Sequence, residues 1–360
     1  MHNEICQRRL AGQFLATVKL ETGIDVVRAL GAVQAQDFAG AKWGVAQRTT
    51  GRTDAEIERE FATGQILRTH VLRPTWHFVA PADIRWMLEL TGPRVSAAMA
   101  PVNRRLELDR AVYRRAYRVF TKALAGGNWQ TRAELAAHLT RAGVGGASGQ
   151  RLGHLMLQAE LDGVVCSGPR RAKQFTYALL DERAPSRPSL ARDEALAELT
   201  RRYFASRGPA TPRDFSWWSG LTVTDARRGI ALLGRGLERL TIDNTEYWLA
   251  AGAPHLTRKV LSAHLLPNYD EYFIGFRDRS AIGQRVRDTS SVTGGSALIP
   301  HVIVVNGELV GLWRRVFEKE RVVVFLEQHA PLTPRERGRV AAEARRFARF
   351  LDRPADVRLA

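Results

Sequence analysis

Two glutamines one residue apart, Gln34 and Gln36, are the residues of this sequence whose types and spacing best suit a site. They lie between a predicted helix that ends near Gly31 and another that starts near Phe38. In an extended segment, the side-chain period of two places both amides on one face. An amide donates and accepts hydrogen bonds but has no useful pKa, so the pair can hold a water without removing its proton. Such a site suits a reaction whose leaving group is already activated.

Taken alone, a Gln-x-Gln triplet is more often part of a solvated loop than of a site. Two further motifs favour a site: Leu-Arg-Pro-Thr-Trp-His at residues 72–77 and Leu-Leu-Pro-Asn-Tyr-Asp-Glu-Tyr at residues 265–272. The three motifs, in this order, resemble the AlkZ/YcaQ-type winged-helix DNA glycosylases, and the similarity runs over nearly the whole chain. The catalytic motif of that family is Gln-Φ-Gln in the AlkZ branch and Gln-Φ-Asp in the YcaQ branch. Gln34-Ala35-Gln36 therefore resembles the AlkZ branch.

The resemblance implies a monofunctional DNA glycosylase in which Gln34 and Gln36 are catalytic. Its substrate would be double-stranded DNA bearing bulky N7-alkylated purines, including interstrand crosslinks; AlkZ-branch enzymes often protect an antibiotic producer from its own genotoxin. The chemistry agrees, because an N7-alkylated purine is a cation that leaves as a neutral base. The enzyme then needs only to stabilise an oxocarbenium-like sugar and to place a water. The rival interpretation is a non-enzymatic winged-helix DNA-binding protein, such as a transcriptional regulator.

The charge of the chain points to the same class of partner. The 360 residues carry a formal net charge of +17, nearly all of it from arginine. This balance favours nucleic acid first and an anionic membrane surface second. Two cysteines cannot form a disulfide framework, and no Cys or His cluster has zinc spacing, so we expect no metal and no cofactor. The sequence has no signal-peptide pattern and no apolar run of membrane-spanning length, so we expect the protein in the cytoplasm, at the nucleoid. We also expect it to be a monomer.

Helix caps and hydrophobic periodicity predict a mostly helical α+β fold. We expect three tandem winged-helix units and a C-terminal β-rich segment that together form a C-shaped DNA-binding channel. The predicted boundaries are residues 1–95 for the first unit, 96–126 for a connecting helix, 127–183 and 189–255 for the second and third units, and 256–360 for the C-terminal hairpin segment and terminal helix.

Two hairpins are predicted from particular residues. Residues 66–79 are rich in β-branched and aromatic side chains, and Pro74 in their middle predicts a bend between two short strands. Asn306-Gly307 is the strongest short-range hairpin signal in the chain, and it predicts a turn between strands at 299–305 and 309–316.

Other titratable and basic residues are candidates for lesser roles. His70, Arg73, His77 and Asp270 lie in or beside the shared motifs and could line the site, although either histidine is more often a satisfied core residue. For Asp270 and its neighbour Glu271, a structural role bracing nearby tyrosines is favoured, and Asp37 would point away from the glutamines. The predicted DNA contacts lie at hairpin tips and flanks: Arg170, Arg171, Lys173, Arg277, Arg279, Arg314 and Arg315.

Overall fold

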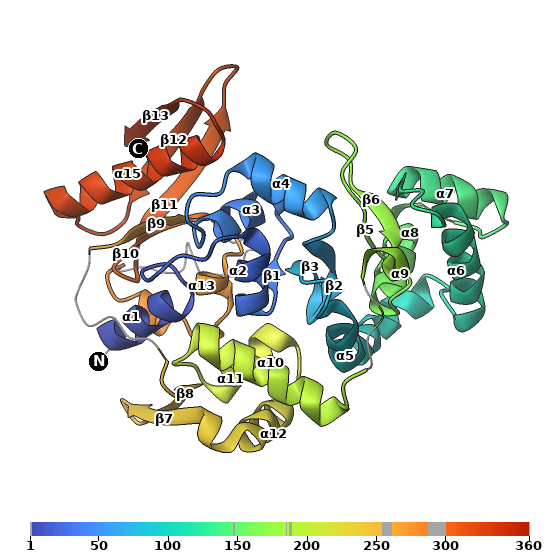
Figure 1. Ribbon diagram of the computed structural model, residues 1–360, viewed down its shortest axis with the longest axis horizontal. Coiled ribbons are helices and arrows are strands. Elements are labelled where there is room, and N and C mark those ends of the chain that lie inside the picture. Colours follow the sequence, from blue (N-terminus) through green and yellow to red (C-terminus); the bar gives the residue numbers. More distant parts are fainter. Residues whose placement is uncertain are drawn as a thin grey trace.

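The glutamine segment lies in the first of several helix-and-hairpin groups (Figure 1). The computed structural model describes residues 2–146, 148–184, 186, 189–253, 261–286 and 300–359. The first group contains α1 (His2–Gly12), α2 (Gly23–Leu30), β1 (Val33–Gln34), α3 (Phe38–Ala46), α4 (Asp54–Ala62), β2 (Leu67–Val71) and β3 (Arg73–Val79). Thr22 caps α2, and Thr53 with Glu56 forms a capping box on α4.

Strands β1, β3 and β2 form an antiparallel sheet with β3 in the centre. Its register pairs His77 with Gln34 on one side and with Thr69 on the other. The predicted bend at Pro74 is misplaced, because the chain turns at Leu72, whose φ is 65°, and Pro74 lies within β3. Proline is tolerated there because the β2–β3 ladder is irregular at this end and the β1 pairing begins farther along β3.

The second group forms a lobe at one side of the molecule (Figure 1). It contains α5 (Ile84–Arg105), α6 (Arg110–Leu124), β4 (Gln130–Thr131), α7 (Arg132–Arg141), α8 (Gly149–Leu161), β5 (Val165–Ser167), β6 (Thr176–Leu179) and α9 (Leu180–Arg183). A capping box of Thr131 and Glu134 starts α7. Phe120, Leu135 and Leu155 belong to a hydrophobic cluster drawn entirely from this lobe.

The third group packs below the glutamine segment in the view of Figure 1. Its elements are α10 (Arg192–Arg207), α11 (Pro212–Ser219), α12 (Val223–Leu233), η1 (Gly234–Gly236), β7 (Leu237–Ile242) and β8 (Thr245–Ala250). Thr211 with Asp214 and Thr222 with Asp225 form the capping boxes of α11 and α12. The order of helices followed by a hairpin thus recurs along the chain.

The C-terminal region contains more strands than its hairpin signal predicts. Its elements are β9 (Ala263–Leu266), α13 (Glu271–Ile274), η2 (Ser280–Ile282), β10 (Val302–Val305), β11 (Glu308–Phe317), β12 (Val322–Gln328), α15 (Pro334–Phe350) and β13 (Ala355–Leu359). Asn306 and Gly307, both with positive φ, make the predicted turn between β10 and β11. The sheet order is β13-β12-β11-β10-β9, with β13 parallel to β12. Residue 299, the first residue of the predicted strand 299–305, lies outside the described residues.

Two large hydrophobic clusters meet at the glutamine segment. Val33 and Ala35 belong to a cluster that includes Leu265 and much of the C-terminal sheet. Ala32 belongs to a second cluster that includes Trp218 of the third group. The segment is therefore fixed between two cores. Within the described residues, no helix combines the length and apolarity that a membrane span requires.

Candidate active site

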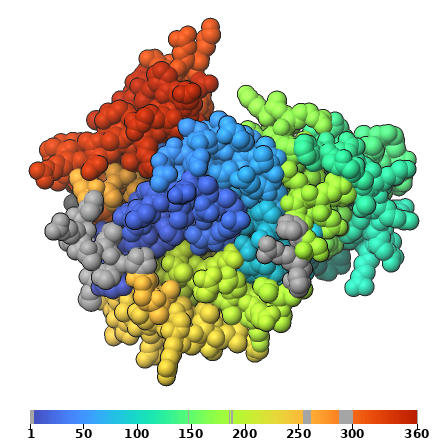
Figure 2. All heavy atoms as spheres, in the orientation of Figure 1, coloured from blue at the N-terminus to red at the C-terminus, as the bar shows by residue number. Residues whose placement is uncertain are grey.

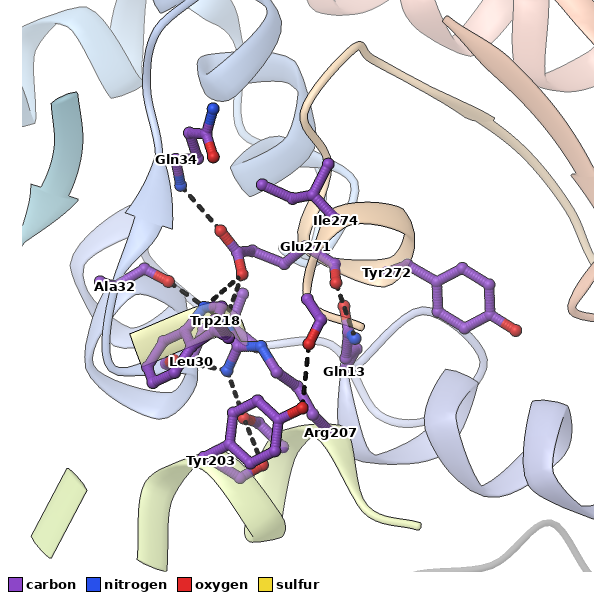
Figure 3. Close-up of polar contacts among 12 residues, drawn as sticks. Gln13, Leu30, Ala32, Gln34, Tyr203, Arg207, Trp218, Glu271, Tyr272 and Ile274 are labelled. Carbon is purple, nitrogen blue, oxygen red and sulfur yellow. Dashed lines mark hydrogen bonds and ion pairs between the residues drawn. The ribbon is translucent and has the colours of Figure 1, made fainter. Parts of the chain in front are cut away.

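The backbone of Gln34 is held in place by secondary structure and by one buried carboxylate. Gly31 ends α2 with a φ of 79°, a conformation that favours glycine, and the chain then enters β1. The N–H of Gln34 donates to Oε1 of Glu271 over 2.8 Å, as Figure 3 shows. The N–H of the next residue, Ala35, continues the ladder to the carbonyl of Trp76.

Glu271 is the centre of a buried polar cluster (Figure 3). Its Oε2 accepts from Nη2 of Arg207 over 2.6 Å and from the indole Nε1 of Trp218 over 2.9 Å. Arg207 also donates to the carbonyls of Leu30 and Ala32, which flank Gly31. Glu271 is 1% exposed and Arg207 is fully buried. Because the charges are paired and hydrogen-bonded, the cluster can hold the glutamine segment rigidly in a region of low dielectric constant.

The two glutamine side chains both interact with β3. Oε1 of Gln34 accepts from Nη2 of Arg73 over 2.8 Å, and the Gln34 side chain is 7% exposed. Oε1 of Gln36 faces the backbone N–H of Trp76 at 3.4 Å, a long and weak contact, and Gln36 is exposed. The structure thus brings Gln34, Gln36 and Arg73 together around one strand.

His77 lies directly across the sheet from Gln34 and is fully buried. Its Nδ1 donates to the carbonyl of Thr75 over 2.9 Å, which leaves the lone pair on Nε2. Burial, reinforced by the charge of Arg73, lowers the pKa of His77 well below its usual range. The imidazole is therefore neutral, and its Nε2 has no hydrogen-bond partner among the described residues.

His70 and Asp270 have their own partners away from the glutamines. His70 pairs with Glu160 of α8, and its ring packs against that of Trp76, with 4.4 Å between the centroids and 42° between the ring planes. Asp270 forms two hydrogen bonds with the buried Arg48, at 2.8 and 2.9 Å, and caps α13. These contacts fix neighbouring elements and do not touch either glutamine amide.

The residue after the pair, Asp37, connects it to the C-terminal sheet. Its side chain caps α3 by accepting from the N–H of Gly40, and it lies 3.5 Å from Nη2 of Arg315 on β11. Arg315 also contacts Nε2 of His301 at 2.9 Å. Burial first, then the charge of Arg315, lowers the pKa of His301 to about 4. This edge of the site is therefore built around one partly buried arginine.

The other basic residues predicted to contact DNA differ in whether their side chains already have partners within the protein. Arg170 makes a two-pronged ion pair with Glu58, and Arg171 pairs with Glu134. Arg279 donates to the carbonyl of Phe273. The remaining three, Lys173, Arg277 and Arg314, are exposed. The Arg314 guanidinium also stacks on Phe325, 3.6 Å from the ring centroid.

A cleft of about 1050 Å³ opens elsewhere, between α11, α12 and the β7–β8 hairpin. Its lining includes Trp248 and the guanidinium-bearing residues Arg213, Arg227 and Arg277. Neither glutamine lines it, so the paired amides lie outside this cleft. Among the described residues, no group of His, Cys, Asp and Glu is arranged to hold a metal ion.

Sequence reasoning missed Glu271, Arg207 and Trp218 as residues of this site. Glu271 was visible only as the neighbour of Asp270 in a shared motif, and no local pattern shows which of two adjacent carboxylates faces the glutamines. Arg207 and Trp218 lie in helices of another group, where their types are ordinary. Only the tertiary contacts reveal their role.

Comparisons with known proteins agree on one family. A family model described as DNA glycosylase AlkZ-like matches residues 27–350. The chain is 26% identical over 330 residues to an interstrand DNA cross-link repair glycosylase of Streptomyces sahachiroi, with 88% of each chain covered. The solved structure of the Streptomyces sahachiroi DNA glycosylase AlkZ superimposes with a TM-score of 0.83, at 23% identity and 99% coverage of both chains. The mixed, mostly helical fold described above is thus the fold of that glycosylase.

Proposed function

Because this chain belongs to the DNA glycosylase AlkZ-like family, we propose that it is a monofunctional DNA glycosylase. Its proposed substrate is a bulky N7-alkylated purine in duplex DNA, including interstrand crosslinks formed through such adducts. The observation that carries the proposal is that the amides of Gln34 and Gln36 both lie against β3, where Arg73 holds Gln34 and Gln36 faces the backbone of Trp76. We further propose that the lesion comes from a genotoxin made by the producing cell, so that the enzyme serves self-resistance.

The proposed mechanism needs no general acid. Alkylation at N7 places a positive charge on the purine, so the C1′–N9 bond breaks with its electron pair moving to the base, which leaves neutral. Water held by Gln34 and Gln36 then forms the new bond to C1′ of the oxocarbenium-like sugar. The released proton passes to solvent, because neither amide binds a proton at neutral pH.

For DNA binding, we propose that the three helix-and-hairpin groups act as winged-helix units around the duplex. Figure 2 shows a hollow in the molecular outline over α4, between the C-terminal sheet and the β5–β6 hairpin. Lys173 lies in the loop between β5 and β6, and Arg314 lies on β11 of the C-terminal sheet; both are exposed. Exposed cations on both sides suit the phosphates of a duplex lying between them.

The alternative is a winged-helix regulator that binds DNA without chemistry. In that protein the glutamines would be ordinary loop residues. The buried Glu271 cluster favours the enzyme, because five hydrogen bonds from three chain segments would be a costly way to fix a loop without a task. The two functions make opposite predictions for base release.

The test is single-turnover release of N7-methylguanine, measured beside a DNA-binding isotherm. We expect Gln34→Ala or Gln36→Ala to slow release by about ten- to a thousandfold, or about 1.4–4 kcal/mol, while binding is unchanged. The double variant should fall short of the product of the two effects, because both amides hold one water. Gln36→Asp should retain part of the activity.

Uracil-containing duplex is the matched control substrate. Uracil is an uncharged base, so its release needs an acid that the amides cannot supply. We expect no uracil release by the wild type. Full N7-methylguanine release by the double alanine variant, or no release by the wild type, would contradict the proposal.

A further inference from the structure

The contact between Arg73 and Gln34 determines which way the Gln34 amide lies. The two ends of a glutamine amide have nearly the same shape, so the hydrogen-bond partners decide their assignment. A guanidinium has only donors, and therefore the atom 2.8 Å from Nη2 of Arg73 must be Oε1. The Nε2 end is directed the other way, and Figure 3 shows it pointing away from Glu271.

Arg73 is itself held by close packing. It follows Leu72, whose positive φ makes the turn between β2 and β3. The carbonyl of Leu72 lies so near α11 that a Cβ on Gly220 would come within 2.2 Å of it. The guanidinium lies 6.0 Å from the ring of Trp217, whose indole donates to the carbonyl of Ile274. The turn at Leu72 and its close contact with Gly220 at the end of α11 therefore leave Arg73 little freedom to move.

Gln36 lacks an equivalent partner. Its Oε1 faces only a backbone N–H, at 3.4 Å, and its side chain is exposed. A contact of that length is weak, so this oxygen keeps its capacity to accept a strong hydrogen bond. The side-chain oxygen of Gln34 is thus engaged by a strong donor, whereas that of Gln36 remains available.

We propose that Arg73 is a positioning residue that makes Gln34 the hydrogen-bond donor of the pair and leaves Gln36 as the acceptor. This inference rests on the proposed catalytic role of the two glutamines. A water that accepts from Nε2 of Gln34 and donates to Oε1 of Gln36 keeps one lone pair free for C1′. If both amides presented donors, both lone pairs would be engaged and the water would be a poor nucleophile.

The first test is a double-mutant cycle on single-turnover release of N7-methylguanine. Arg73→Ala should slow release by about ten- to a hundredfold without changing DNA binding. In a Gln34→Ala background the same change should have no further effect, because Arg73 acts through that amide. A further loss in the Gln34→Ala background would overturn the inference, since Arg73 would then act on its own. Normal release by Arg73→Ala would also overturn it.

The second test separates donor from acceptor. Glutamate accepts but, when ionised, does not donate, so Gln34→Glu should abolish release while Gln36→Glu keeps a measurable part of it. The reverse order would exclude the proposed division. Millimolar guanidinium should partly restore release by Arg73→Ala. The control is Arg9→Ala, which removes a guanidinium that is 2% exposed and donates to the carbonyl of Pro209; guanidinium should leave its release rate unchanged.

A spectroscopic readout keeps the inference testable if the wild type releases no base and the proposed function fails. The side-chain amide protons of Gln34, assigned by their loss in Gln34→Ala, are measured by NMR in the wild type and in Arg73→Ala. We expect those signals to shift and to exchange faster with water in Arg73→Ala, and to stay unchanged in Arg9→Ala. Identical signals in wild type and Arg73→Ala would overturn the inference.

Discussion

The arginines inside this molecule and those on its surface do different work. Arg9, Arg48 and Arg207 are buried, and each joins segments far apart in the chain. On α6, by contrast, basic side chains recur every fourth residue and are exposed: Arg110, Arg114, Arg118 and Lys122. None of these four forms an ion pair or a side-chain hydrogen bond with another described residue. A net charge of +17 therefore combines two populations with different roles.

Each population has its own physical cost. A buried guanidinium loses its hydration, and its ion pair and carbonyl partners must replace those lost hydrogen bonds. The exposed stripe on α6 keeps its water, but like charges at four-residue spacing destabilise a helix by about 0.2–0.5 kcal/mol per pair. The buried arginines are thus compensated by their partners, whereas the repulsion within the stripe is not. We propose that the stripe contacts a polyanionic partner.

The largest expected effect comes from breaking a buried pair. Arg207→Met should reduce the free energy of unfolding by about 3–5 kcal/mol, because Glu271 is left buried without its cation. Urea unfolding measures the change. Arg114→Met on the exposed stripe is the control and should stay within about 0.5 kcal/mol of wild type. A change of similar size in both variants would remove the distinction between the two populations.

A smaller effect concerns pH and the partly buried Lys19. Burial first, then the charges of Arg346 and Arg48, lowers the pKa of Lys19 to about 7. An unfolded lysine has a pKa of about 10.4, so between these values the unfolded chain binds more protons and stability rises with pH. Over pH 7–10, wild type should gain about 1–3 kcal/mol relative to Lys19→Met. Parallel stability curves for the two proteins over this range would exclude the lowered pKa.

The smallest effect on stability comes from the stripe itself, where the salt dependence should change instead. The double variant Arg114→Gln, Arg118→Gln should keep the free energy of unfolding within about 0.5 kcal/mol of wild type, because no described ion pair is lost. The slope of log affinity against log salt should fall by about 0.9 for each phosphate contact removed. Arg228→Gln is the matched control, because that exposed arginine is paired with Asp193. An unchanged slope in the double variant would leave the stripe without a DNA contact.

Features set by neighbouring residues could be predicted from the sequence. The helix end at Gly31 and the turn at Asn306-Gly307 occur where expected, and capping boxes form at Thr131 and Thr333. Each depends on residues within four positions of one another, so the local sequence nearly determines the local conformation. The family, and with it the glycosylase fold, was likewise predicted from three short motifs.

Features set by distant contacts could not be predicted. Pro74 predicts a bend because proline is rare in central strands, but an irregular β2–β3 ladder accommodates it within β3. Strands β9 and β13 carry no strong turn signal, and the sheet supplies their pairing. In the site, the adjacent Asp270 and Glu271 bind different arginines, and only these tertiary contacts decide which carboxylate faces Gln34.

The buried contact from Gln34 to Glu271 also bears on the order in which the molecule folds. It joins residues 237 positions apart in the chain. The hydrophobic cluster of the second lobe, by contrast, lies wholly between Leu108 and Tyr177. Closing a long loop costs more entropy than closing a short one, so contacts between distant residues form late. During refolding, base release should therefore return after helical circular dichroism, since the amide pair is set only when the C-terminal half has docked.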